Sequence, residues 1–269
     1  MLTYPHIDPI IVEIGPFALR WYSLAYIAGF LTGLWAMKLG NRKFSLIPPR
    51  PELIDDVLYY AIPAVILGGR LAYVCIYNPQ YYLSEPWEAL KIWHGGMSFH
   101  GGMMGLAVAL WVYCRRRKVN ALAFGGLAAL AAPPGLFFGR VANFINGELY
   151  GRPTDSPFGM VFPGAGDAPR HPSQLYEAGL EGIALGIVLW ALAFALKKTR
   201  GYVDGRALIG MFLLGYAAAR TFLERFREPD EQIGFLWGSI TMGQTLSFPM
   251  ALVGVALLYV GCKKKATAL

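Results

Sequence analysis

Long apolar stretches separated by short polar ones set the pattern of this sequence. A helix needs about 20 mostly apolar residues to cross the hydrocarbon core of a bilayer. The sequence has seven stretches near that length, which predicts seven membrane-spanning helices: 21–38, 53–76, 99–114, 122–144, 176–196, 208–226 and 242–262. Small residues at helical spacing, as in HGGMMG and LGYAAAR, favour close contact between helices over exposure to lipid.

The composition supports this interpretation. Hydrophobic residues make up 55% of the 269 residues and charged residues only 15%, against about 25% in soluble domains. The formal net charge of +7 would suggest nucleic-acid binding in a soluble chain. In a membrane protein, the positions of the charges along the chain matter more. We therefore expect one all-α, polytopic membrane domain over 1–269, with no nucleic-acid partner.

Basic residues gather in every second loop, which predicts the orientation of the chain. The clusters are Arg42, Lys43 and Arg50; Arg115, Arg116, Arg117 and Lys118; Lys197, Lys198, Arg200 and Arg206; and Lys263, Lys264 and Lys265. Short loops rich in lysine and arginine stay in the cytoplasm. The alternation predicts an outer N-terminus and an inner C-terminus. Among the loops left outside, 145–175 is too long for a simple turn, and we expect it to form most of a small outer cap.

The cysteines and histidines form no recognisable reactive motif. Cys75, Cys114 and Cys262 lie in or beside apolar stretches and form no CxxC pair, so we expect buried, inert thiols. The four histidines form neither HxxxH nor HExxH, and GxSxG is absent. We expect no metal, no cofactor and no serine nucleophile.

Several polar residues stand near the ends of the apolar stretches, where burial is costly. Arg140 and Asn143 lie three residues apart at the end of the fourth stretch, and so on one face of a helix. Tyr216, Arg220 and Glu224 are spaced four apart in the sixth stretch and form a polar stripe. The predicted topology places both groups at the outer side of the membrane.

Three further stretches contribute residues at the same level. Arg70 lies in the outer half of the second stretch, and His100 opens the third. His171 and Glu177 stand at the start of the fifth. The predicted topology therefore gathers titratable residues from five spans at one depth.

Many of these residues also have a purely structural interpretation. Arg220 and Glu224 could form an ion pair, and His100 could cap a helix. Tyr26 could be an ordinary interfacial aromatic residue. We expect Arg227 to be solvated or to lie at the level of the lipid headgroups.

Those interpretations leave one coincidence unexplained. Arg70, Arg140 and Arg220 come from three predicted spans, share one depth and outnumber the nearby carboxylates. A surplus of buried positive charge calls for an anionic ligand, and the planar guanidinium group suits phosphate. A phosphate at this depth most simply belongs to a phospholipid headgroup. The residues indicate an outer-leaflet pocket for an anionic lipid, with a histidine and carboxylates available for proton transfer.

Four sequence blocks carry a family resemblance. GGMSFHGG, GRVANFINGELYGRPTD, RHPSQLYE and YAAARTFLERFREPD stand in one fixed order. They resemble the characteristic blocks of the bacterial prolipoprotein diacylglyceryl transferases, and the likeness runs from IGPFALRWYSLAYIAGF to TMGQTLSFPM. The resemblance implies an inner-membrane enzyme whose active site faces the periplasm. Such an enzyme moves a diacylglyceryl group from phosphatidylglycerol to the cysteine thiol of a lipoprotein precursor, which forms a thioether and releases glycerol phosphate.

The resemblance also assigns roles to individual residues. It implies phosphate binding by Arg140, an essential role for Arg220 and activation of the thiol by His100. The resemblance also implies that further residues take part in substrate binding or activity: Tyr26, Asn143, Asn146, Glu148, Gly151, Tyr216 and Glu224.

Physical reasoning adds how these residues would act. We expect Arg140 and Arg220 to clamp the phosphate while Glu224 orients Arg220. Asn143 and Asn146 would donate hydrogen bonds to the glycerol headgroup. We expect Arg70 and Glu177 to support the substrate-binding residues.

Three other functional classes fit the sequence less well. A transporter or lipid flippase would use a midplane site and repeated broken helices, whereas the polar residues here cluster outward. An intramembrane protease would need a serine–histidine or paired-aspartate arrangement within the spans, and none is evident in the sequence. A purely structural anchor would not need so many buried arginines.

Overall fold

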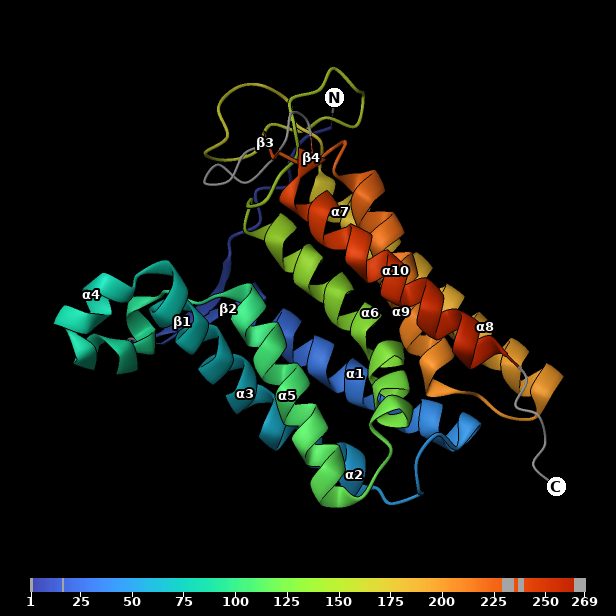
Figure 1. Cartoon of the computed structure of the whole chain (residues 1–269). Helices are drawn as coiled ribbons and strands as arrows, with labels where there is room; N and C mark the ends of the chain where they lie inside the picture. The colour runs from blue at the N-terminus through green and yellow to red at the C-terminus, as the bar shows by residue number, and fades with distance from the viewer. Residues whose placement is uncertain (1, 16, 229–234, 237–239, 264–269) are drawn as a thin grey trace. The chain divides into compact units, whose positions relative to one another are not determined.

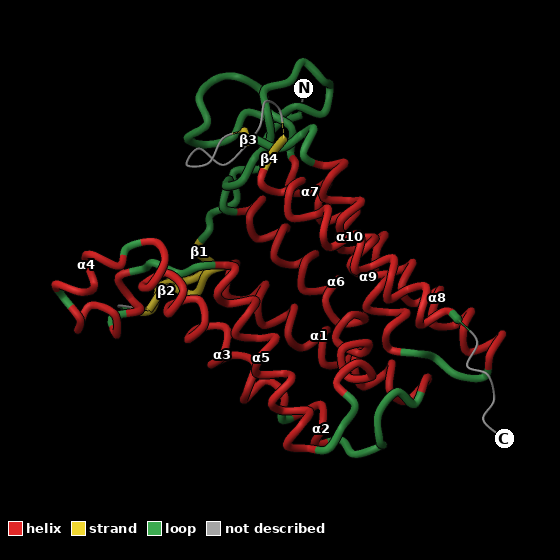
Figure 2. Tube along the Cα trace, viewed as in Figure 1, coloured by secondary structure: helices red, strands yellow, loops and turns green. Residues whose placement is uncertain are grey.

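The computed structural model describes residues 2–15, 17–228, 235–236 and 240–263. Most of these residues are helical, as Figures 1 and 2 show. Contacts group the chain into two compact units, which are described separately below. The first unit combines Met1–Leu46 with Gly125–Leu269, and the second is Ile47–Phe124.

All seven predicted stretches are helical in the structure. They correspond to α1 (Trp21–Phe44), α2 (Glu52–Asp55) with α3 (Val57–Ala72) and η1 (Tyr73–Tyr77), α5 (Phe99–Arg117), α6 (Ala121–Ile145), α7 (Ser173–Glu177) with η4 (Ala178–Ala184) and α8 (Leu185–Arg200), α9 (Gly205–Leu223), and α10 (Met242–Cys262). Among the described residues, five helices are long and apolar enough to cross a membrane: Glu52–Ile76, Ala121–Ile145, Ser173–Arg200, Gly205–Leu223 and Met242–Cys262. The prediction of a multi-pass helical membrane protein is confirmed, and the count of seven spans stays a prediction.

The first unit has an apolar core in which α6, α8 and α9 meet. Leu130, Leu189 and Leu208 are fully buried within it. Helices α9 and α10 lie side by side (Figure 1). A Cβ atom at Gly210 of α9 would lie 2.3 Å from the backbone nitrogen of Leu258, so only glycine permits this close approach. In the predicted segment LGYAAAR itself, a Cβ atom at Gly215 would lie 2.6 Å from Cδ1 of Leu185, so this small residue serves close packing, as predicted.

Helix α10 also carries an exposed apolar stripe. Phe248, Leu252, Val255 and Tyr259 recur at helical spacing, and their exposed fractions are 68%, 58%, 53% and 65%. A helix face of this kind is unfavourable in water but suited to hydrocarbon. The stripe supports a lipid-facing position for α10.

The second unit is built on a tight pair of helices, α3 and α5. A Cβ atom at Gly101 would lie 2.4 Å from the carbonyl oxygen of Gly68, and one at Gly105 would lie 2.3 Å from that of Ala64. The HGGMMG segment therefore makes the backbone contact that its small residues predict. The loop between the two helices folds into short segments: α4 (Pro79–Ser84), η2 (Pro86–Leu90) and η3 (Ile92–His94).

Two short antiparallel strand pairs depart from the all-α expectation. They are β1 (Ile10–Ile14) with β2 (Phe17–Arg20), and β3 (Phe235–Leu236) with β4 (Ile240–Thr241). Both pairs lie in segments outside the apolar stretches, where hydropathy gives no helical signal. The protein is thus mainly, but not purely, helical.

Residues 145–175 form an irregular segment that packs in a small apolar cluster together with Tyr4 and Phe144. Tyr4, Phe144, Met160 and Phe162 form a buried cluster. The Tyr4 hydroxyl donates a hydrogen bond of 2.8 Å to the carbonyl oxygen of Phe144. This compactness supports the predicted cap, whose position outside the membrane stays a prediction.

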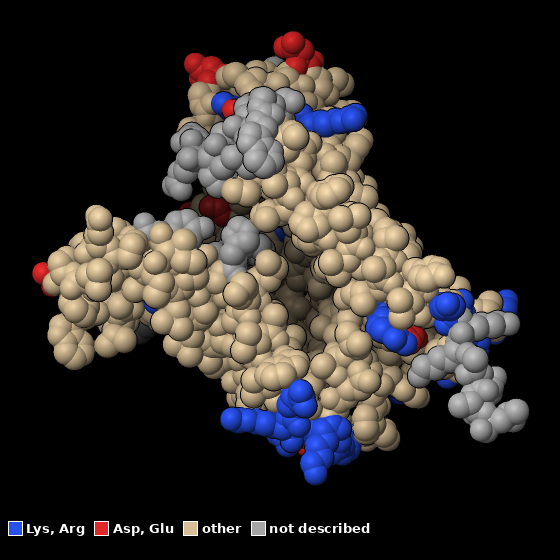
Figure 3. All heavy atoms as spheres, viewed as in Figure 1, with Lys and Arg blue, Asp and Glu red and all other residues tan. Residues whose placement is uncertain are grey.

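Charged side chains are sparse over the helices on the face drawn in Figure 3. Within the second unit, lysine and arginine side chains gather around the end of α5. Within the first unit, they gather where α8 leads into α9. Both clusters match basic loops that the sequence assigns to the cytoplasm.

Candidate active site

One buried carboxylate in the first unit contacts three arginines. Glu177, the last residue of α7, is 1% exposed. Its Oε2 lies 2.6 Å from Nε of Arg140 in α6, and its Oε1 lies 3.0 Å from Nη1 of Arg227, just after α9. The same Oε1 lies 3.7 Å from Nη1 of Arg220 in α9. The convergence of Arg140 and Arg220 that the sequence predicts is therefore present in the structure.

Two more carboxylates complete this arginine–glutamate cluster. Oε1 of Glu224 forms an ion pair with Nη2 of Arg220, one helical turn earlier, at 2.9 Å. The same oxygen lies 3.9 Å from Nε of Arg227. Glu181 lies 3.7 Å from Nη2 of Arg140. The members of the cluster are Arg140, Arg220, Arg227, Glu177, Glu181 and Glu224.

The prediction that positive charge exceeds negative charge is wrong for this cluster. Three guanidinium groups face three carboxylates. The sequence prediction counted Arg70, which belongs to the second unit, and it did not include Glu181. It also treated Arg227 as solvated, whereas Arg227 is 8% exposed and pairs with Glu177.

Close packing of glycines against neighbouring helices fixes the cluster. A Cβ atom at Gly243, the second residue of α10, would lie 2.4 Å from Oε1 of Glu224 and 3.1 Å from Nε of Arg220. A Cβ atom at Gly182 of η4 would lie 2.9 Å from Cα of Phe137 in α6. Gly243 lets the backbone of α10 approach the side chains of Arg220 and Glu224, and Gly182 lets η4 pack against α6, the helix of Arg140.

Some polar atoms of the cluster lack hydrogen-bond partners among the described residues. Nη1 of Arg220 is buried and donates no hydrogen bond to a described residue. Both carboxylate oxygens of Glu181 are also buried, and neither accepts a hydrogen bond from a described residue. Unpaired buried donors are costly, and they are suited to an anionic ligand. Tyr216 lies within electrostatic range of Arg140, Arg220 and Glu181.

The turn after α6 is organised around Glu148. Its Oε1 accepts hydrogen bonds from the side-chain amides of Asn143, at 2.7 Å, and Asn146, at 3.5 Å. The Gln174 amide donates to the carbonyl oxygen of Glu148 at 2.6 Å. The amide donors of the two asparagines thus hold Glu148, a contact that sequence reasoning did not foresee. Their predicted contact with a glycerol headgroup stays a prediction.

Gly151 fills a position that only glycine can occupy. A Cβ atom there would lie 2.2 Å from the carbonyl oxygen of Phe226 and 2.9 Å from Cβ of His171. Its N–H donates to the carbonyl oxygen of His171 at 2.9 Å. Gly151 therefore joins the cap to the segment after α9, which carries Arg227.

His171 lies beside this junction and outside the candidate spans. Its Nδ1 is 3.3 Å from the Tyr176 hydroxyl, and its ring packs edge-on against Phe226. Burial lowers the pKa of His171 below its usual value, because a charged imidazolium loses hydration there. The structure therefore favours the neutral ring.

Two further predicted site residues, Tyr26 and His100, stand in α1 and α5, and Tyr26 lies within electrostatic range of Glu148. Tyr26 of α1 is 54% exposed, and its hydroxyl is 3.4 Å from that of Tyr22. His100 is the second residue of α5, and its side chain lies outside the part of the chain that the structure describes. Cys75 is exposed rather than buried as expected, since η1 presents it at the surface, whereas Cys114 is buried.

Arg70 is held within the second unit by backbone carbonyl groups. It is 5% exposed. Its Nε donates to the carbonyl oxygen of Ala89 at 2.9 Å, and Nη2 donates to that of Glu88 at 2.5 Å. Three more carbonyl groups accept from its guanidinium group, namely those of Lys91, Gly95 and Gly96. These contacts use all five donors, which favours a structural role over direct contact with a ligand.

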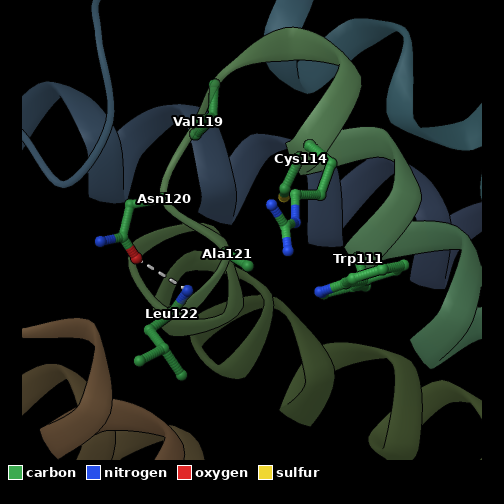
Figure 4. A pocket seen from close by; sticks show the side chains of 7 residues that line it. Trp111, Cys114, Val119, Asn120, Ala121 and Leu122 are labelled. Atoms are coloured by element: carbon green, nitrogen blue, oxygen red, sulfur yellow. Dashed lines mark hydrogen bonds between the residues drawn. The ribbon is translucent and has the colours of Figure 1, made fainter.

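A cavity in the second unit contains none of the predicted site residues. It measures about 310 Å³ and lies at the turn between α5 and α6 (Figure 4). Arg115 and Trp111 both line the cavity, and Cζ of the Arg115 guanidinium group lies 5.2 Å from the centroid of the Trp111 ring. The Asn120 side chain beside it accepts from the backbone N–H of Leu122, which caps α6. Arg115, the charged residue that lines this cavity, is exposed, whereas the cluster around Glu177 is buried.

Comparison with known proteins identifies the family. The family model of the prolipoprotein diacylglyceryl transferases matches residues 9–260. The chain belongs to the prolipoprotein diacylglyceryl transferase family.

Curated relatives match this transferase chain over nearly its whole length. A phosphatidylglycerol–prolipoprotein diacylglyceryl transferase of Rhodospirillum rubrum is 50% identical over 99% of the chain and 97% of its own length. A protein of the same name from Methylocella silvestris is 50% identical over 99% of the chain and 98% of its own length. One from Nitratidesulfovibrio vulgaris is 46% identical over the full length of both chains.

Proposed function

We propose that this protein transfers the diacylglyceryl group of phosphatidylglycerol to the cysteine thiol of bacterial lipoprotein precursors. The reaction forms a thioether and releases glycerol phosphate. One observation carries the proposal: Arg140 and Arg220 meet at buried Glu177 between apolar helices, and Nη1 of Arg220 has no hydrogen-bond partner among the described residues. The names of the relatives state this activity, which supports the proposal.

The chemistry explains why arginines are needed. The thiolate attacks the glyceryl carbon next to the phosphate, and the carbon–oxygen bond breaks. The electron pair leaves with the phosphate oxygen, so negative charge on the phosphate grows in the transition state. Fixed guanidinium groups in a site of low dielectric constant stabilise that charge by several kcal/mol. Because a guanidinium stays protonated at any physiological pH, the clamp is permanently charged.

The attacking thiol must also lose its proton. A free cysteine has a pKa of about 8.5, so a base raises the fraction of thiolate at neutral pH. His100 is the residue proposed to accept this proton. Its place at the start of α5 follows Ser98, whose side chain caps that helix by accepting from the N–H of Gly101.

Other residues are proposed to orient the reacting groups. Glu224 holds Arg220 through the ion pair of 2.9 Å. Asn143 and Asn146 are proposed to donate hydrogen bonds to the glycerol headgroup, and both side chains also hold the carboxylate of Glu148. The remaining residues proposed to bind substrate or to support those that do are Tyr26, Arg70, Gly151 and Tyr216.

The proposed setting is the bacterial inner membrane. Seven spans would place the N-terminus outside, the C-terminus inside and the active site toward the periplasm, with 145–175 as most of a cap on a single domain. The alternation of basic loops supports this orientation. Fusing a periplasm-dependent reporter enzyme after residue 118 and after residue 160 tests it. Activity of the fusion after 160 alone agrees with the orientation, and activity of the fusion after 118 alone contradicts it.

A reconstituted reaction tests the transferase function. The purified protein is incubated in detergent with phosphatidylglycerol labelled in its acyl chains and a precursor peptide that contains the signal-peptide cysteine. The expected product is a labelled peptide, and a peptide with Cys changed to Ser stays unlabelled. Free glycerol phosphate should appear in equal amount. Movement of lipid between vesicles without any peptide adduct would instead indicate a transporter.

A further inference from the structure

Glu181 is a fully buried carboxylate in the cluster, and sequence analysis gave it no role. It lies in the π-helical segment η4 and is 0% exposed. The next residue, Gly182, packs against the backbone of Phe137 in α6. This contact sets Glu181 against the part of α6 that carries Arg140. Local π-helical geometry of this kind frequently occurs at functional sites.

Glu181 is the least stabilised anion of the three carboxylates. Glu177 lies near three guanidinium groups, at 2.6, 3.0 and 3.7 Å, and Glu224 lies near two, at 2.9 and 3.9 Å. Glu181 has one guanidinium contact, at 3.7 Å, and neither of its oxygens accepts a hydrogen bond from the described residues. Since nearby positive charge and donated hydrogen bonds favour a carboxylate over its acid form, the charged form of Glu181 receives the least support from the groups around it.

Binding of an anion would weaken the one guanidinium contact that Glu181 has among the described residues. The cluster is balanced, with three positive and three negative groups. A phosphodiester that binds Arg140 brings a fourth negative charge and competes for the guanidinium beside Glu181. A buried carboxylate that loses its cation is strongly unfavourable. A proton on Glu181 removes this conflict.

We propose that Glu181 takes up a proton when the phosphodiester of a lipid binds Arg140. The proton comes from solvent and adds to a carboxylate oxygen of Glu181, so the cluster returns to electrical balance without moving a helix. Release of the anion returns the proton. The role rests on the proposed phosphatidylglycerol site. The titratable and charged side chains that act on Glu181 are Arg140 from α6, Glu177 from α7, Tyr216 and Arg220 from α9, and Arg227 after α9.

Calorimetric titration measures this proton directly. Purified protein in detergent is titrated at pH 8 with dioctanoyl phosphatidylglycerol, in two buffers of different ionisation enthalpy. A phosphodiester does not titrate near neutral pH, so any proton taken up belongs to the protein. Linkage predicts uptake of about one proton per lipid by the wild type and none by Glu181→Gln. The lipid dissociation constant of the wild type should rise up to about tenfold per pH unit above neutrality, and that of Glu181→Gln should stay constant.

A matched control is Glu228→Gln. Glu228 pairs with Arg170 at the surface, where its side chain is 44% exposed, and it has no ion pair with the cluster. This variant should take up the same proton as the wild type. Thermal unfolding reports whether Glu181→Gln is folded. If it is not, an infrared band of a protonated carboxylic acid that appears when the wild type binds lipid provides the test.

The outcomes separate this proposal from the transferase function. Wild-type protein that binds the lipid without a proton, or Glu181→Gln that takes up the same proton, overturns the role of Glu181. In either case, transfer of the diacylglyceryl group to the precursor peptide would leave the transferase function intact. Absence of both lipid binding and transfer in the wild type would overturn the two proposals together.

Discussion

Arg140 and Arg220, from helices α6 and α9, reach the two oxygens of one buried carboxylate, that of Glu177. Glu177 thereby holds two guanidinium groups at one place between apolar helices. Nη1 of Arg220 has no hydrogen-bond partner among the described residues. Such a pair offers a phosphate oxygen charge-assisted hydrogen bonds from two sides.

The close contact at Gly243 gives a first prediction. Gly243→Ala places a methyl group 2.4 Å from Oε1 of Glu224, so the carboxylate and its partner Arg220 must shift. Misplacement of a charged group in an active site costs about 10- to 100-fold in rate. Transfer assays should show that loss. Gly179→Ala in η4, where the new Cβ would meet no heavy atom within 4 Å, should keep the wild-type rate. Equal rates for the two variants would show that Gly243 does not position Glu224.

A second prediction concerns Arg70. Arg70→Ala removes the guanidinium group that donates to five backbone carbonyl groups of the segment after α4. The second unit should lose about 2–5 kcal/mol of stability. Limited proteolysis should then cleave between residues 79 and 96 faster than in the wild type. Lys91→Ala, which breaks only the ion pair with Glu88, should change cleavage little. Intact resistance in Arg70→Ala would argue against this anchoring role.

A third prediction concerns His171, whose burial should make the stability of the fold depend on pH. Burial lowers its pKa in the folded state, so the neutral ring stabilises the fold above the unfolded pKa of about 6.5. This contribution is lost as the pH falls from that value through the lowered folded pKa. His171→Phe keeps an aromatic ring against Phe226 but cannot be protonated, so its Tm should fall less than that of the wild type between pH 7 and 5. His6→Phe is the control. A Tm of His171→Phe that falls as steeply as the wild type would refute this assignment.

The cysteines provide a fourth prediction. Changing Cys75, Cys114 and Cys262 to Ala together should leave transfer to the peptide intact, because the attacking thiol belongs to the substrate. Loss of buried Cys114 should lower stability by about 1 kcal/mol. Thermal unfolding separates this effect from activity. A folded but inactive triple variant would point to a thiol of the enzyme.

The sequence predicted the helices and the meeting of two arginines for physical reasons. Hydropathy marks helices that must satisfy their own backbone in lipid, so all seven stretches proved helical. Arg140 and Arg220 stand near the ends of two such helices, which is enough to predict their common level. Glu177 was expected only as a supporting residue, because nothing in its spacing shows that it contacts three guanidinium groups.

Other parts of the site depend on tertiary structure. Glu181 stands four residues after Glu177 within an apolar stretch, a signal that could have revealed it. Arg227 follows a helix end in a charged segment, which is typical of a surface, and only packing shows its burial. The carbonyl partners of Arg70 come from a loop whose fold has no local sequence signature.

The rate of diacylglyceryl transfer by variants of the two arginines tests the account most directly. With phosphatidylglycerol and the precursor peptide, Arg140→Ala should show no measurable transfer. Arg220→Lys should lose about 100-fold or more, because an ammonium group cannot replace the planar fork. Arg225→Ala, an exposed neighbour on the same segment, should retain the wild-type rate. Folded Arg140→Ala protein that transfers at the wild-type rate would contradict the phosphate clamp.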